Sequence, residues 1–183
     1  MKMKSCFAVF LVLGMVLGGY RLVTAAEVSL KDYNAVVVQD LEVPSGSPAP
    51  ESAGMQMAEK AVYQIKRYNQ NNKLFDAVVK EGGKAGKETV SGKKVLIIKG
   101  EVREWTPPTV GRQIGRSFIP GVGGHIGSAT FAAHYQFIDK ESGKMIYETD
   151  LRTSSIASND TVEYAMERNG EALAKVITKF KGK

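Results

Sequence analysis

The residues best suited to chemistry are His125 and His134, the two histidines of the chain. A metal site would need carboxylates to complete it, and Asp139 and Glu141 are merely near the histidines in sequence. Strand alternation places His134 on a polar face, which is the position of an ordinary surface histidine. No serine lies in a nucleophile elbow, and no pair of carboxylates has a distinctive spacing. We therefore expect no metal site, no catalytic residue and no enzymatic activity.

A second candidate for chemistry is the glycine spacing Gly121-x-Gly123-x-x-x-Gly127. The dinucleotide-binding fingerprint has the spacing G-x-G-x-x-G and opens a helix. The spacing here differs by one residue, and the residues from Ala129 to Phe137 alternate as they do in a strand. We therefore expect no nucleotide and no other cofactor.

Residues 1–26 have the pattern of a secretory signal peptide, with a basic start, an apolar run and small residues at the end. The apolar run, Phe7 to Leu17, is shorter than the roughly 20 residues that cross a bilayer. We expect cleavage after Ala25 or Ala26. The alternative is that the segment is retained as an uncleaved membrane anchor, because Arg21 lies close to the cleavage site. The protein is then exported and periplasmic, and association with the outer membrane stays open.

The cysteine and charge content exclude several classes of protein. Cys6 is the only cysteine, and it lies at the start of the apolar part of the signal instead of at its end, where lipid attachment would need it. We therefore expect no lipoprotein, and a mature chain without disulfides or zinc–thiolate sites. The chain has 25 lysines and arginines against 19 acidic residues, but three basic residues precede Glu27, the first acidic one. The remaining excess of three does not favour a nucleic-acid partner.

Hydrophobic periodicity predicts five strands and two helices in residues 27–183. Apolar runs or alternation indicate the strands, and apolar residues three and four apart indicate the helices. Asp160 with Glu163 resembles a capping box at the start of the second helix, and a turn at Asp139–Gly143 joins the last two strands. The predicted elements are a strand at 33–43, a helix at 53–69, strands at 74–79, 95–105, 129–137 and 145–151, and a helix from about 160.

This order, β-α-β-β-β-β-α, predicts a single α+β domain at 27–183. Because each helix has one apolar stripe, we expect a two-layer sandwich, with both helices on one face of a mixed sheet of about five strands. The predicted stripe of the first helix is Met55, Ala58, Ala61, Val62, Ile65 and Tyr68, and the inward face of the last strand is Met145, Tyr147, Thr149 and Leu151.

Residues 80–94 are rich in lysine and glycine and contain almost nothing to bury. We interpret them as a solvated loop or hairpin tip. The alternative is a contact with an anionic surface such as lipid headgroups, which keeps a membrane surface among the candidate partners.

Several features together resemble a known family. They are the early valine-rich strand, Leu74-Phe75 before a short strand, the run Ile98-Lys99-Gly100-Glu101-Val102, the glycine stretch and the Asp139…Gly143 turn. From Tyr33 to Phe180 the chain resembles bacterial exported proteins of the domain-of-unknown-function 4410 group. More distantly it resembles the domain shared by the TolB amino-terminal region and the curli secretion channel lipoprotein. The resemblance implies an envelope protein that acts through protein contacts.

The segment 111–127, GRQIGRSFIPGVGGHIG, is the main candidate site. Glycine permits positive φ and close packing, so a surface loop with bulges is the simplest interpretation. Five large apolar side chains favour a protein-docking element instead, because exposed apolar patches mark interfaces. Membrane insertion is a third interpretation, but Pro120 would interrupt a single membrane helix.

Trp105, the only tryptophan, is expected to be a partly buried cover at the end of the preceding strand, with binding as the alternative. The candidate partner-binding residues are Trp105, Gly111, Ile114, Gly115, Arg116, Phe118, Ile119, Gly121, Gly123 and Gly127.

From these observations we expect a non-enzymatic exported envelope protein with an assembly or adaptor role. It would contact an envelope protein or another copy of itself around residues 111–127. The alternative is a periplasmic module that binds a lipid or a cell-wall fragment, with residues 111–127 as a lid over the ligand.

Overall fold

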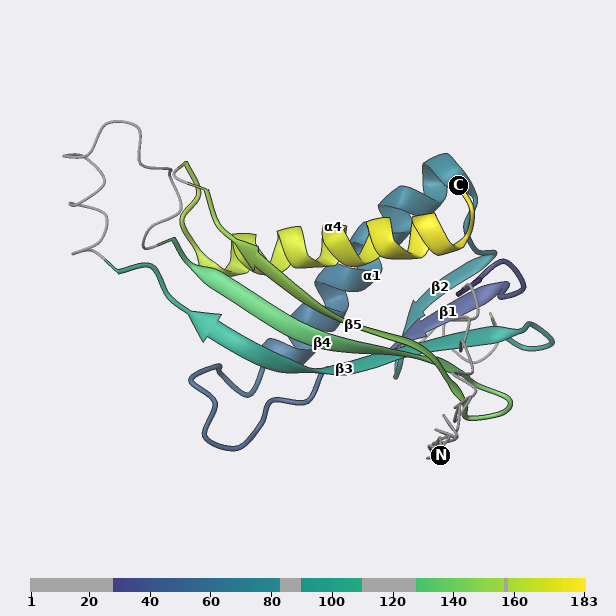
Figure 1. Cartoon of the computed structure of the whole chain (residues 1–183), viewed down its shortest axis with the longest axis horizontal. Helices are drawn as coiled ribbons and strands as arrows, with labels where there is room; N and C mark the ends of the chain where they lie inside the picture. The colour runs from purple at the N-terminus through teal and green to yellow at the C-terminus, as the bar shows by residue number, and fades with distance from the viewer. Residues whose placement is uncertain (1–27, 83–89, 110–127, 157) are drawn as a thin grey trace, which may run out of the picture.

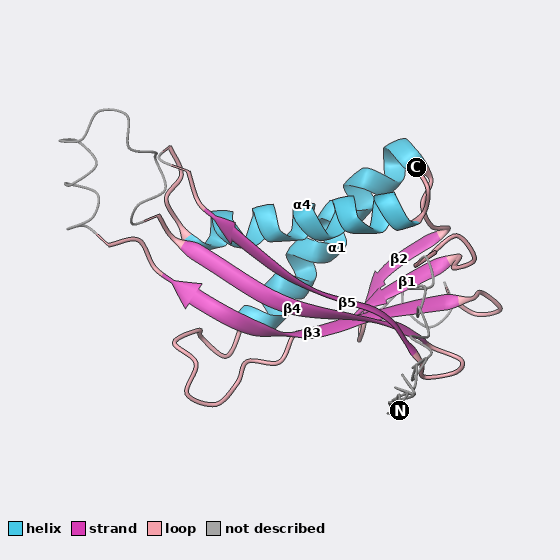
Figure 2. Cartoon of the chain, in the orientation of Figure 1, coloured by secondary structure: helices cyan, strands magenta, loops and turns pink. Residues whose placement is uncertain are grey.

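The computed structural model describes residues 28–82, 90–109, 128–156 and 158–183. These residues form an α+β fold in the predicted order β-α-β-β-β-β-α (Figure 1). Both helices lie on one side of the sheet, and helix and strand layers are distinguished by colour in Figure 2. The elements are β1 (Ala35–Val38), α1 (Ala53–Asn72), β2 (Ala77–Lys80), β3 (Val95–Thr106), β4 (Thr130–Asp139), β5 (Met145–Ser154) and α4 (Val162–Phe180).

The sheet is mixed, as predicted, and its strand order is β2-β1-β3-β4-β5. β1 pairs in parallel with both β2 and β3. β3, β4 and β5 form an antiparallel meander. The long strands β3 and β4 therefore run side by side from one end of the molecule to the other, and they lead toward residues 110–127.

One face of the sheet carries the main core. Phe131, Ala133, Tyr135 and Phe137 alternate along β4, and all four are completely buried. The same four residues alternate with more polar ones in the sequence, which predicts this buried face. It packs against both helices, which also pack against each other. Burial of each large apolar side chain stabilises the fold by roughly 1.5–3 kcal/mol, so this strand contributes strongly to the stability of the domain.

β1 is covered on both faces, which is what its continuous run of valines, Val36 to Val38, predicts. Val36 and Val38 belong to the main core. On the other face, Ala35 packs in a smaller cluster with Val79 and Val90. The strand is nevertheless shorter than predicted, because the chain leaves the sheet after Val38 and returns only for one isolated bridge.

α1 differs from its predicted bounds and buried stripe. The helix continues to Asn72 and ends at Lys73, which has a left-handed φ of 49°. Met55, predicted to be buried, is 43% exposed, while Met57 is buried. The reason is the close approach of Gly54 to the backbone carbonyl of Leu41, where a Cβ would lie only 1.8 Å from the oxygen. This contact sets which face of the helix meets the sheet.

Two strand predictions also need correction. Leu74 and Phe75 are buried, but they lie before β2, because the Asn69 side chain holds Phe75 through its backbone N–H and carbonyl. Met145 of β5 was predicted to face the core and is 47% exposed. A register shift between Phe137 and Ile138 changes the pairing at that end of the strand.

The predicted signal peptide, residues 1–26, and the glycine segment 111–127 lie outside the described residues, as does part of the 80–94 loop. Among the helices in the described ranges, none combines the length and apolar character that a bilayer crossing needs.

Candidate functional site

The ends of β3 and β4 that adjoin residues 110–127 are held together by aromatic packing. Trp105 is paired with Phe131 across the two strands. Their rings meet edge to face, with centroids 6.2 Å apart, a geometry that adds to the stabilisation from burial alone. Trp105 is half-buried and packs against the main core, which confirms its prediction as a partly buried cover.

The start of β4 is fixed by Asp160, which lies just before α4. The Ala129 N–H donates to the Asp160 carboxylate at 2.8 Å, and the Ser155 hydroxyl donates to the same oxygen. The Ser155 N–H in turn donates to the Ala129 carbonyl at 2.8 Å. These bonds join β4, the end of β5 and the start of α4 at one point.

The capping box predicted from Asp160 and Glu163 is therefore wrong. Thr161 is the N-cap, and its hydroxyl accepts from the Tyr164 N–H at 3.1 Å. Asp160 is one residue too early to cap the helix, and its carboxylate is engaged by the start of β4 instead.

Of the predicted partner-binding residues, only Trp105 lies within the described ranges. The structure thus shows where the two strands lead toward the glycine segment, and it brings Trp105 and Asp160 to that same end. The remaining candidates lie outside the described residues, namely Gly111, Ile114, Gly115, Arg116, Phe118, Ile119, Gly121, Gly123 and Gly127.

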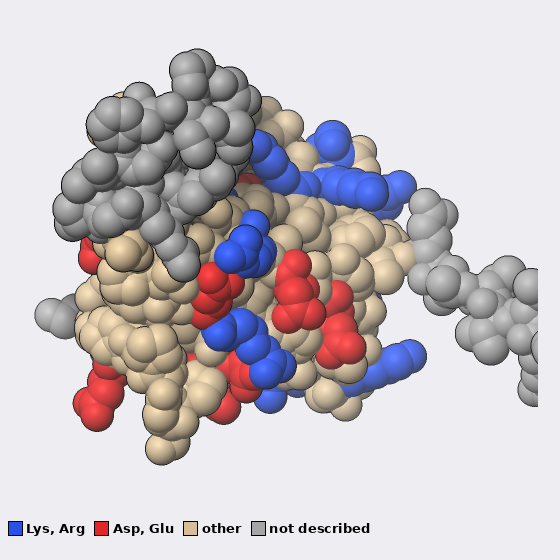
Figure 3. Space-filling model, turned by 60° about the vertical axis from the view of Figure 1, so that its left-hand side comes forward, with Lys and Arg blue, Asp and Glu red and all other residues tan. Residues whose placement is uncertain are grey.

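The outer face of the sheet, away from the helices, carries paired charges. Arg152 of β5 donates two hydrogen bonds to Glu104 of β3, at 2.7 and 3.0 Å. This contact lowers the pKa of Glu104 and raises that of Arg152. Basic and acidic side chains are interleaved on the face visible in Figure 3. Nucleic-acid binding requires a large patch of positive charge. A face whose charges are paired in this way is poorly suited to that kind of partner.

His134 lies on this outer face, as predicted for a strand residue opposite the core. Its Nδ1 is 3.0 Å from the Asp150 carboxylate, and its Nε2 is 3.5 Å from Glu148. The two carboxylates approach different ring nitrogens, so they do not converge on one point where a metal ion could sit. Asp139, the carboxylate nearest in sequence, is turned to the core face, where Tyr33 donates to it at 2.9 Å. No group of three potential metal ligands occurs among the described residues, and His125 lies outside them.

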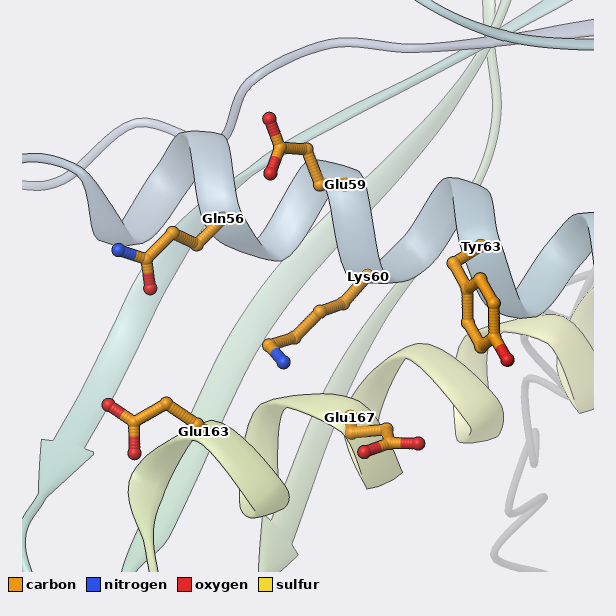
Figure 4. Close-up of a pocket in the computed structure, with 6 residues that line it drawn as sticks. All are labelled: Gln56, Glu59, Lys60, Tyr63, Glu163 and Glu167. Atoms are coloured by element: carbon orange, nitrogen blue, oxygen red, sulfur yellow. The ribbon is translucent and has the colours of Figure 1, made fainter.

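A groove of about 490 Å³ runs between α1 and α4. In Figure 4, the Lys60 side chain extends from α1 toward α4, where Glu163 and Glu167 lie. The groove is open and lined mostly by polar and charged side chains. A lid over an apolar ligand would need a different kind of pocket, so this groove gives that alternative no support. The lining residues are Gln56, Glu59, Lys60, Tyr63, Glu163 and Glu167.

Sequence reasoning missed a buried polar cluster around Asn169 of α4. The Tyr135 hydroxyl donates to Asn169 Oδ1 at 2.7 Å, and Asn169 Nδ2 donates to the Leu151 carbonyl at 2.9 Å. Burial raises the pKa of Tyr135 well above its ordinary value. The signal was present in the sequence, because Asn169 lies three residues after Met166 and four before Leu173, on the apolar stripe of the helix.

Comparison with known proteins identifies the fold. No protein-family model matches the chain, so the resemblance to the domain-of-unknown-function 4410 and TolB groups stays unconfirmed. No curated protein sequence matches it either.

The structure is similar to the single chain of PelC from Paraburkholderia phytofirmans, a dodecamer that is known in two crystal forms. A single-residue variant of PelC has a TM-score of 0.51 and 14% identity, covering 84% of this chain and 90% of that chain. The second PelC structure has a TM-score of 0.50 and 14% identity, covering 84% and 91%. A Xanthomonas campestris protein of the domain-of-unknown-function 330 family has a TM-score of 0.47 and 10% identity, covering 83% of each chain. The similarity in structure shows that the chain shares the fold of PelC, and an identity of 14% shows the fold alone.

Proposed function

We propose that this chain is a non-enzymatic exported envelope protein that acts through protein–protein contacts. The contact surface is the end of the sheet formed by Trp105, the start of β4 and residues 111–127. The observation that carries the proposal is the anchoring of this end, where Asp160 holds the start of β4 and Trp105 packs on Phe131. Between two anchored strands, the sequence places five large apolar side chains, and apolar groups gathered at one surface favour a protein partner.

The absence of enzymatic activity is supported by how the described ionisable groups are used. The Tyr33 hydroxyl donates to Asp139, and burial together with this bond raises the pKa of Tyr33 to about 12. The Tyr135 hydroxyl donates its hydrogen bond to Asn169. Both nitrogens of His134 face carboxylates. Each of these contacts joins elements of the fold, and none presents a nucleophile and a base to one open site.

Self-association is the form of contact that the comparison favours. PelC, which has the same fold, is a dodecamer. We propose that this chain also associates with copies of itself, since soluble oligomers are mostly built from identical subunits. The proposal concerns the kind of partner, and it does not carry over the arrangement of subunits in PelC.

Replacement of Ile114, Phe118 and Ile119 by serine tests this proposal. The exported protein should lose its higher-mass species in light scattering and its crosslinked products in cells, because the apolar contact is removed. Circular dichroism should stay unchanged.

A matched control replaces three exposed apolar residues elsewhere, Met55, Tyr63 and Met145. This control should leave association intact. If the serine variant at 114, 118 and 119 keeps its mass and crosslinked products, or if the control loses them equally, the proposed surface is wrong.

A further inference from the structure

The end of the molecule opposite the proposed contact surface is rich in lysine. It is formed by residues 28–34, 73–76, 90–94, 139–144 and 179–183, which meet at the right-hand side of Figure 1. Backbone hydrogen bonds join these segments: Leu30 to Phe180, Asn34 to Lys94, Asp76 to Asn34 and Lys140 to Val95. We call this surface the lysine end. Its side chains comprise nine lysines and four carboxylates, a net charge of +5.

Five of these lysines line two hollows in the surface. The first hollow, of about 490 Å³, contains three lysines and one glutamate. The second, of about 420 Å³, contains two lysines and no acidic residue among its lining. The lysines of the first hollow are Lys93, Lys94 and Lys140, and those of the second are Lys31 and Lys179.

The acidic residues at this end neutralise the lysines weakly. Lys93 and Asp76 are 4.0 Å apart, as are Lys94 and Asp32, and the two aspartate side chains are 66% and 84% exposed. Exposed pairs at this separation contribute little and are screened by salt. Lys181 is different, because it points inward and donates to the Tyr33 carbonyl at 2.7 Å. Lys93 is only partly exposed, but the other seven lysines at this end are exposed and can meet an external anion.

The chain also enters the domain at this end. Val28, the first described residue, lines the second hollow beside Lys31 and Lys179. The sequence before it is predicted to be a secretory signal, with an apolar run at residues 7–17. If the signal is retained, it tethers this end to a bilayer. If it is cleaved, the carboxylate of Glu27 offsets the positive charge of the new amino terminus, and the lysine end keeps its net charge of +5.

We propose that the lysine end docks on a membrane surface that carries anionic lipid headgroups. This inference goes beyond the proposed function, because it assigns a second surface, with a lipid partner, to the opposite end of the sheet. Lysines near such a surface are attracted by its negative potential, and the attraction decays within about 10 Å at 0.1 M salt. Docking here would leave the proposed protein-contact surface facing away from the membrane.

Cosedimentation with vesicles tests the proposal. The exported protein, with its amino terminus identified by mass spectrometry, is mixed with vesicles of phosphatidylethanolamine and phosphatidylglycerol in equal parts, and with vesicles of phosphatidylcholine alone. We expect binding to the anionic vesicles that exceeds binding to the neutral ones and disappears at high salt. The double variant K140E/K179E should bind at least about 25-fold more weakly, at roughly fivefold per lysine.

The matched control is K66E/K99E, which changes the net charge equally at two exposed lysines outside the lysine end. It should retain most of the binding, and circular dichroism should show both variants folded. Equal binding to neutral vesicles, or equal losses in the two variants, would overturn the proposal. Binding to a duplex DNA fragment without binding to anionic vesicles would also overturn it, in favour of a nucleic-acid partner. Because residues 111–127 are untouched, failure here leaves the proposed function standing.

Discussion

Replacing Asn169 with alanine should destabilise the domain by several kcal/mol, because this amide joins α4 to the last two strands. Asn169 is completely buried. Its Oδ1 accepts from the Tyr135 hydroxyl at 2.7 Å, and its Nδ2 donates to the Leu151 carbonyl at 2.9 Å and to the Thr153 hydroxyl at 3.3 Å. Alanine keeps the helix and removes all three bonds at once.

The magnitude follows from these bonds. Loss of the two bonds made by Nδ2 costs about 1 kcal/mol each, and a buried Tyr135 hydroxyl without a partner costs about 1–3 kcal/mol more. Alanine recovers about 0.6 kcal/mol through its higher helix propensity. The expected net loss is roughly 2–4 kcal/mol, which is a large fraction of the stability of a typical domain.

Urea unfolding of the exported protein, followed by circular dichroism, measures this loss. Asn71→Ala, at an exposed position of α1, should change stability by at most about 0.5 kcal/mol. A double-mutant cycle with Tyr135→Phe should show a coupling of about 1 kcal/mol or more. A loss below about 1 kcal/mol in Asn169→Ala, or additive effects of the two substitutions, would refute the assigned network.

Two further predictions concern β3 and the β4–β5 turn. Gly100→Ala should destabilise the sheet by roughly 3 kcal/mol in urea unfolding, because its Cβ would lie 1.9 Å from the His134 carbonyl oxygen; an unchanged midpoint would contradict this packing. The Ser142 N–H and hydroxyl, with help from Tyr33, lower the pKa of Asp139 to about 2 from an ordinary value of 3.8. Its contribution to stability is therefore complete above pH 4 and is lost as the pH falls toward 2, so Asp139→Asn should flatten the stability profile in that window. An unchanged profile would rule out this role of Asp139.

The predicted fold is correct in class and order because periodicity is a local property. The alternation from Phe131 to Phe137 identifies a strand and its buried face without any knowledge of neighbours. The Asp139–Gly143 turn was equally predictable, and Gly143 has a positive φ of 67°, a conformation for which turns favour glycine. Patterns of this kind depend only on the geometry of the element that carries them.

Two of the predictions that failed did so because of a partner far away in the sequence. Asp160 matches a capping pattern in sequence, yet its carboxylate bonds Ala129, which is 31 residues away. Met55 fits the apolar stripe of α1, but the contact between Gly54 and Leu41 sets the buried face. In both cases the local pattern allowed more than one arrangement, and a contact with a residue elsewhere in the chain selected between them.

The candidate contact surface was predictable only in part. The apolar and glycine content of residues 111–127 is a fact of composition, and the position of Trp105 at the end of β3 could be read from the strand pattern. That Asp160 lies at the same end could not, since no local pattern connects residue 160 with residue 129.

The sequence by itself determined the element types, their order and the buried face of β4, because these follow from local spacing. Only the tertiary structure decided which charges share a surface. Lys31, Lys93, Lys140 and Lys179 are spread over nearly the whole chain, and in the sequence each looks like an ordinary solvated lysine. The parallel start of β1, β2 and β3, the β4–β5 turn and the end of α4 bring them to one end of the molecule. Electrostatic potential sums over distance in space and not along the chain, so the lysine end exists only in the folded protein.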